Sequence, residues 1–169
     1  MKYLLLTLPL FVASCGYHVA GQSDLLPKTL NTISIPAFTN LSTRYKLTDR
    51  LPEAIAREFT ARTRYRIVSD PNAADMVLRG SVNNYISFAT VIDPTTGRAT
   101  AVDLRAYIQV TLVERATGKV LFTRPNMEVR ERYEISLNPG QYFEESDAAL
   151  DRVSRTAGQQ VVTAILENF

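Results

Sequence analysis

The stretch that decides the fold reads MVLRGSVNNYISFATVI and spans residues 76–92. Its large apolar side chains share one parity: Met76, Leu78, Val82, Ile86, Phe88 and Ile92. The other parity holds polar residues and a tyrosine: Arg79, Ser81, Asn83, Tyr85 and Ser87. Successive side chains of a β-strand point to opposite faces, so this period of two predicts a long, half-buried strand. We expect the first set to face the core and the second set to face solvent.

The chain after residue 92 repeats the pattern. Residues 93–97 (DPTTG) predict a turn in which Gly97 can adopt a positive φ angle. The next strand has an inward apolar set: Val102, Leu104, Ala106, Ile108, Val110 and Leu112. Its outward set is mostly polar: Asp103, Arg105, Tyr107, Gln109 and Thr111. A second turn at Ala116-Thr117-Gly118 leads to a third strand, where Pro125-Asn126 breaks the alternation and predicts a bulge or an edge kink.

Two amphipathic helices flank this meander. One is expected to begin near Thr48 or Asp49, with an apolar stripe at every fourth position: Leu47, Leu51, Ile55 and Phe59. The other is expected from about Glu144 or Ser146 to Leu166, with a second stripe: Leu150, Val153, Ala157, Val161 and Ile165. Residues 32–35 and 65–68 predict two short strands. The sequence therefore predicts an α+β fold: a two-layer sandwich, two helices packed on one face of a four- to five-stranded, mostly antiparallel sheet.

The first fourteen residues differ from the rest. Lys2 precedes the apolar run from Leu4 to Val12, which is the layout of a short secretory signal. Val12-Ala13-Ser14-Cys15 resembles a bacterial lipobox, in which the cysteine is lipidated; an ordinary signal with a nearby cysteine is the alternative. We predict a lipoprotein signal peptide at 1–14, a lipidated linker at 15–28 and a single α+β domain at 29–169. Gly16 after the cysteine favours the outer membrane over retention in the inner membrane.

Composition argues against an enzyme and against nucleic acid as a partner. The whole chain carries a net charge of +2, which is too balanced for general nucleic-acid binding. His18 is the only histidine and Cys15 the only cysteine, so no Cys–His pair or transition-metal cluster is expected, and no cofactor. The carboxylates of Glu144, Glu145 and Asp147 could bind a divalent cation, although acids at a helix N-terminus are the simpler interpretation.

Arginine dominates the basic residues, and several arginines fall on or beside the outward strand face. The candidate contact residues are Arg79, Arg98, Arg105 and Tyr107. A guanidinium group matches phosphates and carboxylates bidentately, so these residues could meet an anionic lipid or an acidic partner surface. The alternative is a merely solvated surface in a chain that favours arginine codons.

Three segments resemble the LptE family of lipopolysaccharide-assembly lipoproteins: Cys15-Gly16-Tyr17-His18-Val19, residues 33–40 (ISIPAFTN) and residues 74–82 (ADMVLRGSV). The resemblance implies a non-enzymatic protein, lipid-anchored on the periplasmic side of the outer membrane. Such proteins plug the LptD β-barrel, help it assemble and assist lipopolysaccharide on its way to the outer leaflet. The phosphates of lipid A would then be partners for Arg98 or Arg105. An oligomerising lipoprotein of another envelope secretion machine is the alternative, and a hydrolase of envelope glycans stays open as a third.

Overall fold

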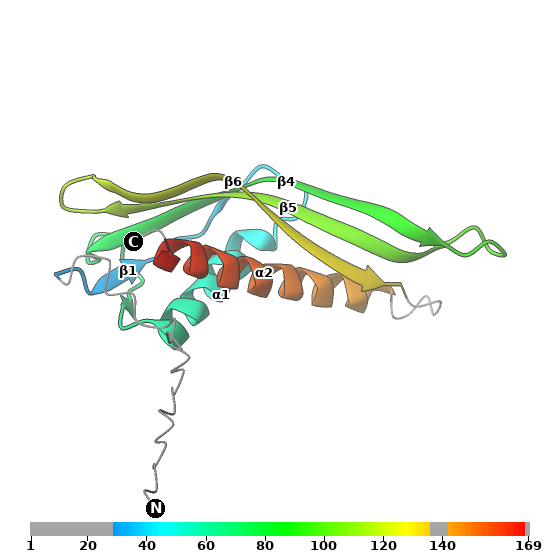
Figure 1. Cartoon of the computed structure of the whole chain (residues 1–169), viewed down its shortest axis with the longest axis horizontal. Coiled ribbons are helices and arrows are strands. Elements are labelled where there is room, and N and C mark those ends of the chain that lie inside the picture. Colours follow the sequence, from blue (N-terminus) through cyan, green and yellow to red (C-terminus); the bar gives the residue numbers. More distant parts are fainter. Residues whose placement is uncertain (1–28, 136–141, 168–169) are drawn as a thin grey trace, which may run out of the picture.

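The computed structural model describes residues 29–135 and 142–167 as one α+β unit with a sheet on one side and two helices on the other (Figure 1). The helices are α1 (Leu47–Arg62) and α2 (Tyr142–Glu167). The long strands are β4 (Met76–Ile92), β5 (Ala99–Glu114) and β6 (Val120–Glu134), and the short ones are β1 (Thr32–Ser34), β2 (Thr39–Asn40) and β3 (Arg66–Ile67). The predicted fold class is confirmed. Nothing tests the predicted division at residues 14 and 28, because both lie outside the described residues.

The sheet is antiparallel in its long strands and parallel in its short ones. The strand order is β3-β1-β4-β5-β6, with β2 also paired to β4. β1 pairs in parallel with both β3 and β4, since α1 carries the chain between β1 and β3 across one face of the sheet. This parallel edge of short strands is a detail that alternation along the chain does not predict.

Both helices cover the same face of the sheet, as predicted (Figure 1). The inward set of β5 and the stripes of both helices are buried and form one core. Two glycines permit close packing in it. A Cβ atom on Gly158 of α2 would lie 3.0 Å from the carbonyl group of Ala54 in α1, and a Cβ on Gly80 of β4 would overlap the ring of Phe38. The first contact brings the helix backbones together, and the second seats Phe38 against the sheet.

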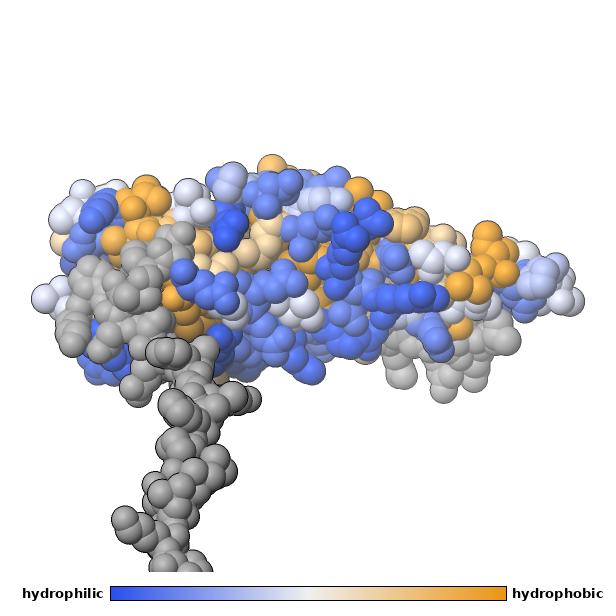
Figure 2. Space-filling view, viewed as in Figure 1, coloured by the Kyte–Doolittle hydropathy of each residue, from blue (hydrophilic) through white to orange (hydrophobic). Residues whose placement is uncertain are grey.

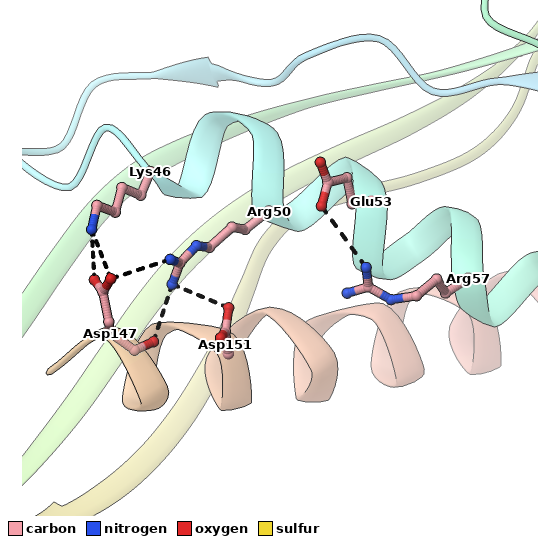
Figure 3. A network of polar contacts seen from close by, with 6 residues as sticks. All are labelled: Lys46, Arg50, Glu53, Arg57, Asp147 and Asp151. Atoms are coloured by element: carbon pink, nitrogen blue, oxygen red, sulfur yellow. Dashed lines mark hydrogen bonds and ion pairs between the residues drawn. The ribbon is translucent and has the colours of Figure 1, made fainter. Parts of the chain in front are cut away.

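Polar contacts also join the two helices (Figure 3). The ammonium group of Lys46, directly before α1, donates to both carboxylate oxygens of Asp147 in α2 at 2.8 Å. Arg50 donates to the backbone carbonyl of Asp147 at 3.0 Å and lies 3.1 Å from the carboxylate of Asp151. These ion pairs lower the pKa of Asp147, with the hydrogen bond from Lys46 as the largest cause. Asp147 therefore serves the packing of α1 against α2.

α1 begins at Leu47, one residue before Thr48 and so near its predicted start. Its N-cap residue is Lys46, which makes no side-chain cap hydrogen bond, so the expectation that Thr48 or Asp49 could cap the helix is wrong. α2 begins at Tyr142, a few residues before the predicted start. The last turn of α1 is closed instead by Thr63, whose N–H and hydroxyl both donate to the carbonyl oxygen of Phe59.

The predicted bulge in β6 is confirmed. Ile108 of β5 pairs with Met127, and Val110 pairs with Arg124. Between these two pairs, β5 advances by two residues and β6 by three. The extra residue of the bulge therefore lies at Pro125-Asn126. Because of this insertion, Val129 is buried although its parity differs from that of Phe122.

A second bulge, in β4, overturns part of the expected inward set. Val82 pairs with Ile108, but Asn84 pairs with Tyr107, so Asn83 is an extra residue and the phase reverses beyond it. Ile86 and Phe88 therefore pair with Arg105 and Asp103 on the outer face. They are 41% and 38% exposed, and Ile92 is 59% exposed. Tyr85 moves the other way: it pairs with Ala106 and packs against the core. The expectation that Ile86, Phe88 and Ile92 face the core is wrong.

Candidate functional site

The sheet face that the helices leave uncovered carries alternating charged and aromatic side chains. We call this side the outer face. On it, β5 and β6 present three cross-strand pairs: Asp103 with Arg132, Arg105 with Arg130, and Tyr107 with Glu128. Directly opposed residues on one sheet face lie close enough to interact. The middle of the outer face is therefore a compact polar patch built by strand register.

Four of these residues form the outer-face cluster: Arg105, Tyr107, Glu128 and Arg130. Arg130 makes a bidentate contact with Glu128, through Nε at 2.9 Å and Nη2 at 3.0 Å. The hydroxyl of Tyr107 donates to the same carboxylate at 3.3 Å, and the Nε atom of Arg105 lies 3.6 Å from it. Glu128 is thus the acceptor around which the other three side chains gather.

The outer-face cluster carries a net positive charge. The hydrogen bond from Arg130 is the largest cause of a lowered pKa for Glu128, and both guanidinium groups add to it. Glu128 in turn raises the pKa of Arg130. Two guanidinium groups face each other across β5 and β6, an arrangement that is unfavourable unless an anion lies between them. One carboxylate offsets one of the two charges, so the four residues of the cluster carry one net positive charge.

Arg105 is the least satisfied member of the cluster. Its Nε atom is buried and has no hydrogen-bond acceptor within the described residues. Its guanidinium carbon lies 5.0 Å from the centroid of the Phe88 ring, within the range of a cation–π contact. A buried donor without an acceptor is costly. The Phe88 ring packs against the guanidinium on one side, and the Glu128 carboxylate, 3.6 Å from Nε, is its ion-pair partner.

The structure brings together only two of the four predicted contact residues. Arg105 and Tyr107 share the cluster. Arg79 is exposed and pairs with Thr111, four residues beyond Tyr107 along β5, which corresponds to roughly 13 Å. Arg98 is exposed in the turn after β4, seven residues before Arg105, which corresponds to roughly 23 Å of extended chain. Cys15, the predicted lipidation site, lies outside the described residues.

Sequence reasoning missed the acceptor of the cluster. Glu128 and Arg130 lie in β6 beyond the Pro125-Asn126 bulge, and alternation after that break places them on the outer face with Arg132. The alternation that places Glu128 on the outer face can be seen in the sequence. The pairing of Glu128 with Tyr107 cannot, because it depends on the register between β5 and β6. Phe88 was missed for a different reason, because it was assigned to the core.

Two further observations concern the whole described part of the chain. Neither helix in residues 29–135 and 142–167 is long and apolar enough to cross a bilayer. The side chains described in residues 29–135 and 147–167 contain no group of three or more His, Cys, Asp or Glu that could hold a metal ion, and the side chains of Glu144 and Glu145 lie outside the described part of the chain.

Comparisons with solved structures place this fold among bacterial lipoproteins. Lipoprotein B from Shewanella oneidensis is 16% identical, with a TM-score of 0.56, over 82% of this chain and 96% of that one. A minor lipoprotein from Acinetobacter baumannii is 19% identical, with a TM-score of 0.55, over 84% of this chain and 95% of that one. Lipoprotein B from Nitrosomonas europaea is 14% identical, with a TM-score of 0.54, over 99% of this chain and 97% of that one. At such identities the likeness concerns the fold alone.

The family comparison is more specific than the structural one. No curated protein matches the chain. The profile of the family described as "LptE: Lipopolysaccharide-assembly", however, matches residues 30–165, which include every strand and helix described above except the last residues of α2. The chain therefore belongs to the LptE family of lipopolysaccharide-assembly lipoproteins.

Proposed function

We propose that this protein is a non-enzymatic, lipid-anchored protein of the outer membrane that plugs the LptD β-barrel and assists lipopolysaccharide transport to the outer leaflet. The observation that carries the proposal is the family match over residues 30–165. The two-layer fold supports it, because a plug has to be a rigid body and one face of this sheet is free of helices. The lumen of an outer-membrane barrel is polar, and the outer-face cluster has matching polarity.

Anchoring through Cys15 is the part of the proposal that keeps the protein at the membrane. Two or more acyl chains are needed for stable anchoring, each buried CH₂ group contributing roughly 0.8 kcal/mol. Labelling of cells with palmitate is expected to mark the wild-type chain and to leave a Cys15→Ala variant unmarked. A wild-type chain that takes up no label would contradict the anchor.

The barrel partnership is tested by purification from native outer membranes. We expect a one-to-one complex of the full-length lipoprotein with a large β-barrel, identified by mass spectrometry and by mass measurement in detergent. A ring of identical subunits without a barrel would instead support an oligomeric component of another secretion machine. The stoichiometry therefore separates the two functions.

The outer face is proposed to contact lipopolysaccharide or the barrel wall through Arg105 and Tyr107, with Arg79 and Arg98 at its two ends. A double reversal, Arg98→Glu with Arg105→Glu, is expected to weaken lipopolysaccharide binding or barrel co-purification by about tenfold, since charge-assisted hydrogen bonds are among the strong ones. The matched control is Arg57→Glu, an exposed arginine on α1 whose only described ion pair is with Glu53 at 3.8 Å. If the double variant behaves like the control in both assays, these contacts are wrong.

A further inference from the structure

Exposed apolar side chains gather along one edge of the sheet. Seven large hydrophobic residues of the described chain are exposed, and all but Val120 lie in β4 beyond its bulge or in the loop beside it: Leu41, Tyr45, Ile86, Phe88, Val91 and Ile92. Figure 2 shows apolar surface near the end of the β4–β5 hairpin, in the same view as Figure 1. Scattered single apolar residues need no explanation, but six of seven at one edge do.

The backbone of the same edge has no strand partner, although the N–H of Tyr85 donates to the Oδ1 atom of Asn84 at 2.8 Å. β1 pairs with Met76 and Val77, and β2 pairs with Ser81 and Val82, so these two short strands line only the first half of β4. Over residues 84–92 no strand of the described chain pairs with β4 on that side, while β5 pairs with it on the other. Alternate residues of such a strand turn their N–H and C=O groups away from the sheet. We call residues 84–92 the open β4 edge.

The opposite edge of the sheet, formed by β6, carries residues that hinder pairing with another strand. β6 carries Pro125 and six charged residues: Arg124, Glu128, Arg130, Glu131, Arg132 and Glu134. The open β4 edge reads NYISFATVI and contains neither a proline nor a charged residue. Charged side chains and proline are the usual means by which edge strands avoid pairing with other chains. One long edge is therefore protected against pairing, and the other is left suited to it.

A loop defines where the open β4 edge begins. The N–H of Leu41 donates to the carbonyl oxygen of Val82 at 2.9 Å, which fills the position beside Val82. Arg44, in the same loop, lies over the ring of Tyr85, with its guanidinium carbon 5.4 Å from the ring centroid. The exposed side chains of Leu41 and Tyr45 thus stand at the inner end of the unpaired backbone.

From these features we infer that the open β4 edge receives an extended, uncharged segment of the barrel partner, which adds to the sheet as a further strand; this rests on the function proposed above. An unpaired edge specifies the chemistry of its occupant. Only another extended backbone supplies alternating donors and acceptors at the spacing of a β-ladder, so a lipid chain does not satisfy it. The uncharged side chains of residues 84–92 favour an apolar or small-residue segment, whose end contacts Leu41 and Tyr45.

A second copy of this chain is the other possible occupant of the edge. Antiparallel pairing of two open β4 edges about a two-fold axis at Phe88 would set residue 84 of one copy opposite residue 92 of the other, so register alone does not separate the two occupants. The barrel partner is the occupant that the proposed function supplies, and sedimentation of the free protein tests the second copy.

The test places lysines on the edge of the full-length lipidated protein. The variant is Ile86→Lys with Ile92→Lys, and the matched control is Val120→Lys, at an apolar residue that is 54% exposed at the far end of the sheet. Because lysine blocks edge pairing, we expect about tenfold less barrel to co-purify with the double variant and no comparable loss with the control. Thermal unfolding checks that both variants remain folded. Equal retention of the barrel by all three proteins overturns this inference alone, and absence of a barrel with the wild type overturns the proposed function as well.

Hydrogen exchange reads the pairing directly and does not depend on a variant. In the free wild-type protein, those amides of residues 84–92 that point away from β5 are expected to exchange fast. In the barrel complex, alternate amides of this segment should exchange at least about tenfold more slowly, while residues 120–124 of β6 change little. Unchanged exchange at residues 84–92 in the complex overturns the inference. Protection already present in the free protein overturns it too, because the edge would then be filled by a second copy or by the chain itself, which sedimentation distinguishes.

Discussion

At the scale of single residues, Asp75 joins the starts of two strands. Its Oδ2 atom accepts hydrogen bonds from the N–H of Asn31 at 2.8 Å, the N–H of Thr32 at 3.0 Å and the hydroxyl of Thr32 at 2.9 Å. Its own N–H donates to the Thr32 hydroxyl at 2.8 Å. One carboxylate therefore aligns β1 with β4, which explains an aspartate directly before the long strand. The pKa of Asp75 is lowered, and the hydrogen bond from Asn31 is the largest cause.

Replacing Asp75 by Ala is expected to cost about 1–3 kcal/mol at pH 7, the usual range for losing hydrogen bonds to a charged group. A lowered pKa in the folded state means that this stability is present above the unfolded value of about 3.9 and is lost as pH falls through the folded value. Urea unfolding at pH 7 and near pH 3 should show the gap between variant and wild type narrowing at acidic pH. Exposed Asp49 offers the control, Asp49→Ala. A gap that is the same at both pH values would contradict this role.

At the scale of elements, the bulge at Asn83 decides what the outer face is made of. Without it, Ile86 and Phe88 would lie on the inner face of the sheet and Tyr85 on the outer face, as strict alternation predicts. With it, Phe88 reaches the guanidinium of Arg105, and the outer half of β4 becomes the open β4 edge. A shift of one residue exchanges the two faces of a strand, so this insertion changes which side chains face outward from Asn84 to Ala89, before two further register shifts near Val91.

Deletion of Asn83 is therefore expected to be far more disruptive than its replacement. The deletion forces β4 either to slip against β5 or to exchange its faces, and both outcomes bury and expose the wrong side chains at a cost of at least about 2 kcal/mol. Asn83→Ala keeps the residue count and loses little more than the hydrogen bond from Ser81, so it is the control. Thermal unfolding compares the two. A deletion variant as stable as the substitution would contradict the importance of the bulge.

The helix pair makes a second prediction at this scale. Gly158 lets α2 approach the backbone of α1 at Ala54, and a side chain there must displace backbone atoms. Gly158→Val is expected to destabilise the fold by about 1–3 kcal/mol through overpacking. Gln160→Val introduces the same β-branched residue on the exposed side of the helix, away from the backbone of α1. It should therefore lower the stability of the fold by less. Chemical unfolding of the two variants measures the difference, and equal losses would attribute the effect to helix propensity instead.

At the scale of the whole molecule, the sheet is longer than the layer that covers it. The β4–β5 hairpin extends past the helices, and Ser87 and Ala89 are exposed although they pair with buried residues, Leu104 and Val102 (Figure 1). The central strand β5 is paired on both sides and buried along most of its inner face. Stability should therefore decrease from the helix-covered body toward the hairpin tip.

Hydrogen exchange of the isolated protein should follow this gradient. Amides of residues 104–112 in β5 are expected to be the slowest, and those of residues 86–100 the fastest among the long strands, because the latter have one open edge and no helix beneath them. Mass spectrometry of peptides after a timed pulse measures both segments in one sample, so each serves as the reference for the other. Similar rates in the two segments would show that the tip is as well supported as the body.

Much of this architecture follows from local patterns. Alternation identifies β5 along its length, and the break at Pro125-Asn126 identifies the bulge in β6, because proline cannot continue the ladder. The helix stripes at residues 47–59 and 150–165 identify the side of each helix that is buried. The bulge in β4 was not predicted, because two consecutive polar residues, Asn83 and Asn84, hide the change in the alternation. Arg105 and Tyr107 were found by their parity, whereas Glu128 became part of the same cluster only through pairing of β5 with β6.

The sequence by itself determined the two layers, the meander and the outward arginines. Apolar residues recur with a period of two in the strands and of about four in the helices, and both periods can be recognised from neighbouring residues alone. Only the tertiary structure decided which carboxylate binds those arginines, that β1 and β2 pair in parallel with half of β4, and that the other half is left open. These are properties of register and of strand neighbours. They depend on residues far apart in the sequence, which no local period encodes.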